Sequence, residues 1–424
     1  MKKVLILFLL LFSVASAQTV SGPESEKNPK LYVNGNFYEL KFLKEQLPVV
    51  DLVNDRKDAD IHILVTSQST GSGGNEYLLY FYGQNRFDKM NDTIKVITEV
   101  NESADLVRGK IVRGIKTGMF NYLRRWGLED RMSIGFAGKA PEAPAQKEDP
   151  WNLWVFRTSF SGYFNGESSS QYSSIYGSLS ASRTTEDLRL SFGLSGSYNE
   201  NSYNYDMDGI NYEFTNITRS QSLSASAVKS ISDHWSLGGW SSVYKSTYGN
   251  IDFEWDLSTG LEYNLFPYSE SSQKQLRFTY KLGIMYENYF QETVYFKESE
   301  YLATQNASVI LNLTQPWGSA TFGIYGSNYL QDLTKYSVSL STYFSLRLVR
   351  GLSLNCSFYY SKINNQLSLP RAGASVEDVL LRIRQLETHY SYSASVGLSF
   401  SFGSIFNNVV NPRFGGGGST IYYE

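Results

Sequence analysis

The chain has 424 residues, with 38 basic and 41 acidic side chains and a formal net charge of −3 at pH 7. This near balance gives no sign of nucleic-acid binding, which favours a basic surface. Cys356 is the only cysteine, which excludes an intramolecular disulfide framework and a cysteine-based zinc site. Aromatic residues make up 15% of the chain although its mean hydropathy is −0.30, a combination that suits strands with one apolar and one polar face.

The first residues have the pattern of a secretory signal. Lys2 and Lys3 precede an apolar run over 4–14, and Ala-Ser-Ala follows at 15–17. This order predicts a signal peptide over 1–17 that is cleaved before Gln18. No later apolar stretch reaches the roughly eighteen residues that a membrane helix needs. We therefore expect the mature chain in the periplasm, the outer membrane or the exterior.

Residues 18–30 are polar, and we expect them to be flexible. Residues 31–138 mix helical and strand periodicities, which predicts a small α/β domain. Its expected elements, in chain order, are a helix over 37–46, a strand over 49–53, a hairpin of strands 59–68 and 76–84, a strand over 92–100 and a helix over 103–125.

Three prolines within 139–150 predict an extended linker. Beyond it, about twelve segments alternate apolar and polar side chains, and single-chain bacterial barrels have an even number of strands. The expected barrel occupies 151–405, and a tail follows over 406–424. The expected strands are 153–164, 172–182, 187–199, 211–228, 234–247, 251–265, 275–289, 300–314, 318–330, 335–348, 351–362 and 389–402.

Residues 251–265 show the alternation most clearly. Odd positions from Ile251 to Leu265 are mostly large and apolar, whereas the even positions include Asp252, Glu254, Asp256 and Glu262. Successive side chains of a strand point to opposite faces, so one face is apolar and the other acidic. A lipid-facing exterior and a wet lumen satisfy both faces, which predicts an all-β, antiparallel transmembrane barrel.

The connections between the expected strands alternate in length. Those after even-numbered strands are tight, whereas 200–210, 290–299 and 363–388 are longer and more polar. Short turns lie on the periplasmic side of outer-membrane barrels, so the 31–138 domain is expected in the periplasm. An aromatic girdle is expected at that rim, formed by Trp151, Trp154, Trp235, Phe266 and Trp317.

Charged positions of the polar face are candidates for lining the lumen. The candidates are Arg189, Asp252, Glu254, Asp256, Glu262, Arg277 and Lys281. Their acidic and basic rows are expected to face each other across one ladder. One interpretation is a transverse field that sets ion selectivity. The other is a salt-bridge ladder that only joins neighbouring strands.

The longest expected loop is 363–388, and its second half has apolar residues at helical spacing after Ser375. This helix could constrict the pore, cap the barrel from outside or simply lie on the surface. Glycine-rich residues 66–75 lack the lysine of a phosphate loop and predict a hairpin turn.

Neither a metal site nor an enzyme is expected from the sequence. The histidines, His62, His234 and His389, fall in separate parts of the predicted fold, so no pair has metal-ligand spacing. No nucleophile, base and orienting group can be named together, so we expect neither a cofactor nor an enzymatic role. Cys356 shares parity with Leu354 and Phe358, which predicts a small lipid-facing side chain.

The signal, alternating strands, girdle and turn asymmetry together resemble bacterial outer-membrane β-barrel proteins of the porin-like kind. The expected last strand, SYSASVGLSFSF, ends in an aromatic residue, as do strands recognised by the barrel assembly machinery in that class. Unlike those strands, it is followed by a tail. Residues 59–125 resemble the N-terminal domains of TolB-like envelope proteins, which implies a protein-contact module.

The polar face of several expected strands is rich in serine and glycine and carries charged rows, which predicts an open lumen and a channel for small solutes in the outer membrane. The 31–138 domain would dock a periplasmic protein or gate the inner mouth, and the other expected partners are outer-membrane lipid and the barrel assembly machinery. The alternative is a closed barrel that anchors a structural or envelope-assembly domain.

Overall fold

The computed structural model describes residues 28–34, 40–131, 149–207, 210–349, 351–372 and 384–400. Several sequence predictions fall outside these residues. They are the signal peptide over 1–17, most of the flexible segment over 18–30, most of the linker, most of the helix expected after Ser375, and the tail over 406–424.

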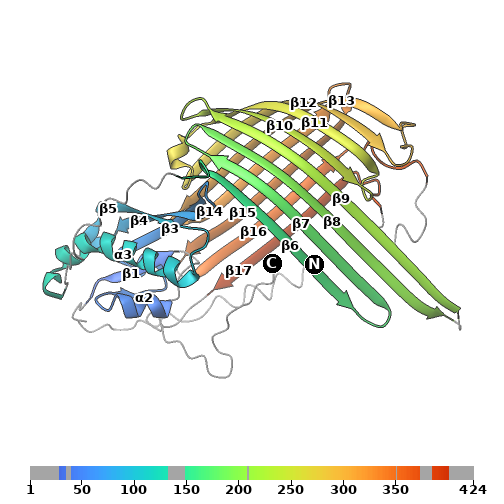
Figure 1. The fold of residues 1–424 in the computed structure, drawn as a ribbon. Coiled ribbons are helices and arrows are strands. Elements are labelled where there is room, and N and C mark those ends of the chain that lie inside the picture. Colours follow the sequence, from blue (N-terminus) through green and yellow to red (C-terminus); the bar gives the residue numbers. More distant parts are fainter. Residues whose placement is uncertain are drawn as a thin grey trace, which may run out of the picture.

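The described residues form a small α/β region followed by a twelve-stranded antiparallel sheet, which confirms the predicted fold class (Figure 1). The first region holds a five-stranded sheet in the order β2-β1-β3-β4-β5. Its elements are β1 (Lys30–Asn34), α2 (Leu40–Gln46), β2 (Asp51–Leu52), η1 (Arg56–Asp58), β3 (Ile61–Ser69), β4 (Asn75–Gly83), η2 (Asn85–Phe87), β5 (Asn91–Thr98), α3 (Ala104–Trp126) and η3 (Glu129–Arg131).

The predicted β3–β4 hairpin, the strand β5 and the helix α3 are confirmed. Strand β1 was not predicted, because its five residues are too few to show a period. It pairs in parallel with both β2 and β3, so its hydrogen-bond partners come from later in the chain. The expected strand over 49–53 is reduced to the two residues of β2.

The core of the α/β region lies between α3 and one face of the sheet. Ile115, Met119 and Tyr122 of α3 are fully buried there, as are Ile63 and Phe81 of the sheet. Two glycines of α3 allow this close packing. A Cβ atom on Gly118 would lie 2.2 Å from Cζ of Phe81, far inside van der Waals contact, so this position requires glycine.

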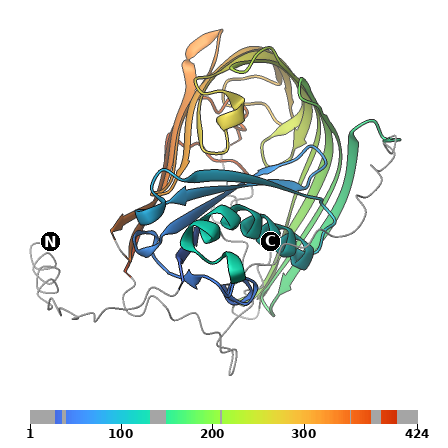
Figure 2. The same ribbon diagram turned by 90° about the vertical axis from the view of Figure 1, so that its left-hand side faces the viewer.

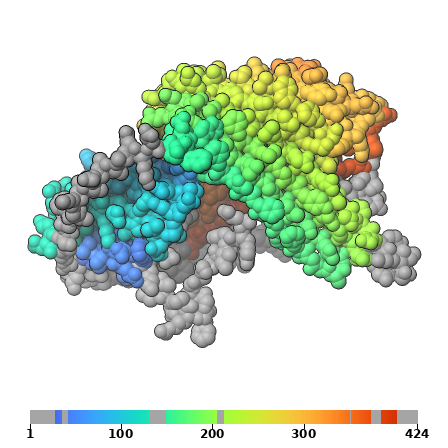
Figure 3. Space-filling view, viewed as in Figure 1, coloured from blue at the N-terminus to red at the C-terminus, as the bar shows by residue number. Residues whose placement is uncertain are grey.

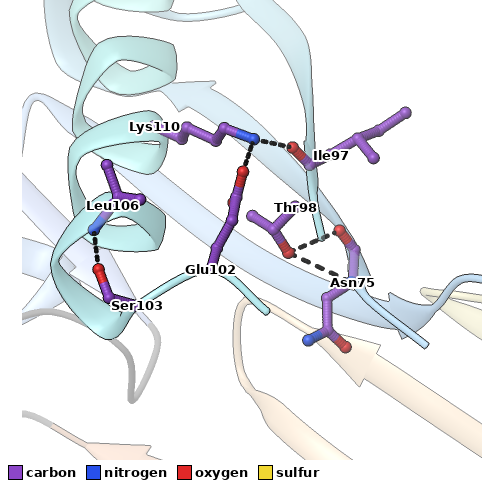
Figure 4. A network of polar contacts seen from close by, with 7 residues as sticks. All are labelled: Asn75, Ile97, Thr98, Glu102, Ser103, Leu106 and Lys110. Atoms are coloured by element: carbon purple, nitrogen blue, oxygen red, sulfur yellow. Dashed lines mark hydrogen bonds and ion pairs between the residues drawn. The ribbon is translucent and has the colours of Figure 1, made fainter. Parts of the chain in front are cut away.

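Polar contacts define the start of α3, as Figure 4 shows. The Ser103 hydroxyl accepts a hydrogen bond from the backbone N–H of Leu106 at 3.4 Å, the usual role of an N-cap serine. Lys110 forms an ion pair with Glu102 and donates to the carbonyl of Ile97 at 3.3 Å, which ties the helix to β5. Among the described residues, no helix is long and apolar enough to cross a membrane.

The twelve-stranded sheet, hereafter the barrel, pairs each strand with the next in sequence, from β6 to β17. The strands are β6 (Trp154–Gly166), β7 (Ser170–Thr184), β8 (Leu188–Met207), β9 (Ile210–Ser230), β10 (Trp235–Ser246), β11 (Ile251–Asn264), β12 (Lys274–Tyr289), β13 (Ser299–Gln315), β14 (Gly318–Tyr329), β15 (Asp332–Val349), β16 (Leu352–Ile363) and β17 (Tyr390–Phe400), with η4 (Tyr268–Glu270) before β12.

The prediction of a polar loop over 200–210 is wrong, because β8 and β9 continue into this segment. Their ladder runs out to the pair Met207–Ile210. Alternating tyrosine and polar residues give this stretch strand character, and tyrosine favours a strand. The β10 ladder with β9 ends at Ser220, so the tip of the β8–β9 hairpin extends beyond its neighbour on that side.

The sheet curves strongly so that one face encloses an interior (Figures 1 and 2). In the described part of the chain, the first strand, β6, and the last, β17, do not pair with each other. The outer face carries exposed apolar side chains in neighbouring positions, such as Leu257 beside Ile284 and Leu261 beside Tyr280. Cys356 lies opposite Phe344 in the β15–β16 ladder.

The α/β region packs against one end of the barrel, here called the inner mouth, which includes the β7–β8 and β11–β12 turns (Figure 3). Figure 2 looks at this end and shows the five-stranded sheet crossing it. The Tyr80 hydroxyl lies 2.9 Å from Oγ of Ser272, and the Gln273 side chain donates to the Tyr82 hydroxyl at 3.1 Å. Side chains of β4 therefore contact the β11–β12 turn directly.

Candidate functional site in the barrel interior

A cavity of about 720 Å³ lies on the inner face of the barrel, between strands β9 and β15. Its walls are mostly serine, glycine, threonine and asparagine, whose small polar side chains leave space. Charged lining residues are few. They are Asp256, Glu262 and Lys281, all of which the sequence pattern had selected as lumen candidates.

Glu262 is held by groups from two elements, β12 and η4. Nη1 of Arg277, on β12, lies 3.7 Å from Oε2 of Glu262. The Tyr268 hydroxyl of η4 donates to Oε1 of Glu262 at 2.9 Å, and Ser236 lies 3.0 Å from that hydroxyl. This end of the expected charge ladder thus contains an acid–base pair on adjacent strands, and the turn residue Tyr268 holds the carboxylate in place.

Lys281 lies nearer the centre of the cavity. Its Nζ atom is 3.6 Å from the centroid of the Trp240 ring, on β10, a distance at which a cation is attracted to the aromatic face. In the described chain, Lys281 forms no ion pair. Asp256 accepts a hydrogen bond of 3.5 Å from Ser258, its neighbour along β11. The cavity therefore presents an ammonium group and a carboxylate that are both available to a solute.

Glu254 does not face a basic residue, which corrects the expected pairing of rows. Directly across from it on β12 is Glu287, and across from Glu287 on β13 is Glu300. The Tyr289 hydroxyl contacts both Glu287 and Glu300, the latter at 2.9 Å. Within the described residues, none of these three glutamates forms an ion pair. The basic side chains thus lie toward the inner mouth and the glutamates toward the opposite end.

Two further lumen candidates have different surroundings. Asp252 falls at the β-bulge between Ile251 and Phe253 and forms an ion pair with Lys245. Lys245 lies on the outer face of β10, so the bulge takes Asp252 away from the row of inward carboxylates. Arg189 lies across from Val228, a cavity-lining residue, and therefore shares the inner face.

The five girdle candidates all lie at the inner-mouth end of the barrel. Trp154 and Trp235 begin β6 and β10, and Phe266 and Trp317 lie in turns at that end. Trp151 and Trp235 are exposed. The role of all five candidates as a membrane-interface girdle stays a prediction.

The outer mouth, at the other end, is crossed by the described first part of the β16–β17 connection, 364–372. Asn250, between β10 and β11, donates to the carbonyls of Gln291 and Ser368, both at 2.9 Å. Arg371 forms an ion pair with Glu292 at 2.7 Å. The connection starts on β16 yet contacts residues that follow β10 and β12, so it passes over the interior rather than staying at the rim.

The histidines lie far apart in the fold, and no group of three or more potential metal ligands occurs among the described residues. His62 is buried in β3 between the rings of Tyr32 and Tyr82, whose centroids are 5.1 and 5.9 Å away. Burial, together with the charges of Arg347 and Arg56, lowers the pKa of His62 to about 3.

Sequence reasoning missed Trp240, Tyr268, Glu287 and Arg347. Trp240 has the same parity as the small residues of β10, and that parity could have placed it inside. Tyr268 and Arg347 lie in or next to turns. There the alternation of apolar and polar residues ends, so it cannot predict which face a side chain takes. Glu287 has the same parity as Arg277 and Lys281 on β12, but its glutamate neighbours are on other strands.

No family model matches the sequence, and no curated protein matches it. Several solved structures are distantly similar. Among them are a NanC porin (10% identity, TM-score 0.27, covering 58% of this chain and 99% of that one), a Pseudomonas aeruginosa FadL homologue (11%, 0.25, 50% and 67%) and the CymD monoaromatic hydrocarbon channel (9%, 0.27, 81% and 87%). Similarity at this level assigns no role to any residue of this chain.

Proposed function

We propose that the protein is an outer-membrane channel for small polar solutes, with its α/β region in the periplasm over the inner mouth. The observation that carries this proposal is the division of the barrel into an apolar outer face and a polar, hollow interior. Exposed leucine and isoleucine side chains on β11 and β12 suit lipid, while a cavity of about 720 Å³ lined by hydroxyl and charged groups suits water and solute.

The distribution of charge suggests how such a pore would select. Glu254, Glu287 and Glu300 lie side by side near the outer mouth, whereas Arg277 and Lys281 lie deeper. A cation entering from outside would meet the carboxylates first. The sign of the charge on the wall therefore changes along the pore axis. We expect the current to differ between positive and negative voltage, in addition to ion selectivity.

A planar-bilayer recording of the mature chain tests both the pore and the selectivity. Replacing Glu287→Gln removes one carboxylate charge from the wall of a cavity near the outer mouth. At about 4 Å in a water-filled lumen that charge is worth about 1 kcal/mol to a cation, which is roughly a fivefold change in its relative occupancy. Glu186→Gln, in the exposed β7–β8 turn, is the matched control and should leave selectivity unchanged. Equal selectivity in the wild type and Glu287→Gln would contradict the assignment.

We further propose that the α/β region gates the inner mouth. A Cβ atom on Gly71, at the β3–β4 tip, would lie 2.7 Å from Cβ of Thr184 at the end of β7. A Gly71→Cys, Thr184→Cys pair in a Cys356→Ser background can therefore form a disulfide after a shift of about 1 Å. A gate predicts low conductance when the pair is oxidised and higher conductance after reduction.

The alternative is a closed barrel that anchors the α/β region for a structural or assembly role. The feature that favours it is the double cover of the interior, by the α/β region at one mouth and residues 364–372 at the other. No conductance in either redox state, in a chain that inserts into the bilayer, would favour the anchor.

A further inference from the structure

A second cavity, of about 580 Å³, lies at the junction between the α/β region and the barrel. It shares no lining residue with the cavity of the lumen. One wall comes from β1, β3 and β4, and the other from the end of β13, the start of β14 and the inner end of β15. The lining residues that matter below are Asn34, Thr66, Ser67, Ser319, Ser345 and Arg347.

Arg347 brings a positive charge into this junction. Its Nη2 atom donates to Oδ1 of Asn34 at 2.8 Å, and its guanidinium carbon lies 5.1 Å from the ring centroid of Tyr32. Its Nη1 atom is enclosed and has no hydrogen-bond partner. No carboxylate lines the cavity, and within the described chain Arg347 forms no ion pair. The Arg347 guanidinium therefore has a hydrogen-bond partner at Nη2 and none at Nη1.

Thr66, on β3, supplies a second unsatisfied group. Its side chain is buried, and its hydroxyl has no hydrogen-bond partner. Buried polar atoms are nearly always hydrogen-bonded, because leaving one without a partner destabilises the fold. These two enclosed donors belong to opposite walls of the same cavity, Arg347 to the barrel and Thr66 to the α/β region.

We propose that this junction cavity binds a small organic solute through its carboxylate or phosphate group. Oxyanions are the acceptors that the planar guanidinium of arginine prefers, since it can offer two parallel N–H donors. Hydroxyls of Ser67, Ser319 and Ser345 lie in the same walls and can bind the remaining oxygens. The volume exceeds that of a bare oxyanion and falls within the usual range for small-molecule sites.

Binding at this site would link the solute to the position of the α/β region. This link rests on the proposed gating function. Arg347 belongs to the barrel and Thr66 to the α/β region, so an anion bound by both would hold the two together. Binding itself does not require conduction, and the test below is independent of whether the pore opens.

The test is calorimetric titration of the detergent-solubilised mature chain with inorganic phosphate, acetate and, as a neutral probe, glycerol. We expect phosphate or acetate to bind and glycerol not to bind. Arg347→Gln should weaken binding about 10- to 100-fold, and Thr66→Val, which keeps the side-chain shape, about 3- to 10-fold. Arg183→Gln is the matched control, because Arg183 also lies at the inner end of a strand but bonds to Asn152. It should bind within about twofold of the wild type.

Arg347→Gln also removes the contact with Asn34, so the α/β region could undock. Repeating the titration in the oxidised Gly71→Cys, Thr184→Cys background keeps the region attached and separates undocking from loss of the site. A loss of affinity in both backgrounds supports the proposal, and the tighter probe identifies the group. Equal binding to all variants, an adventitious ion only, would overturn it, as would the absence of binding to the wild type.

Discussion

We predict that acid destabilises the α/β region through His62. This side chain is 1% exposed and its Nε2 atom has no hydrogen-bond partner. The groups packed around it are the rings of Tyr32 and Tyr82, and the charges that act on it come from Arg347 and Arg56. Burial and these two positive charges disfavour the imidazolium, which lowers the pKa of His62 to about 3 from an ordinary 6.5.

The sign of the pH dependence follows from the difference in proton binding between the folded and the unfolded chain. Between pH 6.5 and 3 the unfolded chain holds a proton on His62 that the folded chain does not. The contribution of His62 to the free energy of unfolding is therefore fully present above about pH 6.5 and is lost as the pH falls through that window. The loss is about 1.4 kcal/mol per pH unit, or about 2 kcal/mol at pH 5.

Urea unfolding of the detergent-solubilised mature chain, followed by pulse proteolysis of the α/β region, measures this loss. His62→Phe keeps an aromatic ring between the two tyrosines but cannot titrate, so the difference between wild type and variant isolates His62 from the carboxylates. His389→Phe, at the outer end of the barrel, should retain the wild-type slope. A pH slope that is the same in wild type and His62→Phe would refute the reasoning.

Two further predictions concern packing and the outer mouth. Gly118→Ala should lower the free energy of unfolding of the α/β region by about 1–3 kcal/mol, because the new methyl group would meet Phe81. Gly109→Ala, on the same helix with nothing within 4 Å, should instead raise it by up to about 1 kcal/mol in urea titrations. Asn250→Gly keeps the positive φ of 60° accessible but removes three side-chain hydrogen bonds. Hydrogen exchange in 364–372 should accelerate about tenfold or more, and unchanged exchange would show that these bonds do not hold the segment.

The strand pattern was predictable from sequence because each strand has one apolar and one polar face. These two faces impose the period of two residue by residue, so the ends of eleven of the twelve expected barrel strands lie within three residues of the observed ends. The β8–β9 hairpin departs from this, because its polar tip has the composition of a loop although its residues pair as strands. Composition shows polarity there, whereas the ladder depends on pairing between the two segments.

The interior site was only partly predictable. Parity placed Asp256, Glu262 and Lys281 on the cavity wall, because parity is a local property of one strand. It could not place Glu254 opposite Glu287, since register between strands is set by turns and bulges. The contact between Asn34 and Arg347 joins residues 313 positions apart, and no local pattern reports such a pair.

The same argument explains why the two ends of the barrel matter more than its wall for function. All twelve strands of the wall place apolar side chains outside and polar side chains inside. A polar interior of this size suits small solutes in general. What distinguishes this chain lies where alternation stops: Asn250 and Arg371 hold a connection across the outer mouth, and Arg347 joins the inner mouth to the α/β region. Each closure depends on a few hydrogen bonds, each worth about 1 kcal/mol. Contacts of that strength can break and re-form, so under the proposed function a bound solute would shift the balance between covered and open mouths.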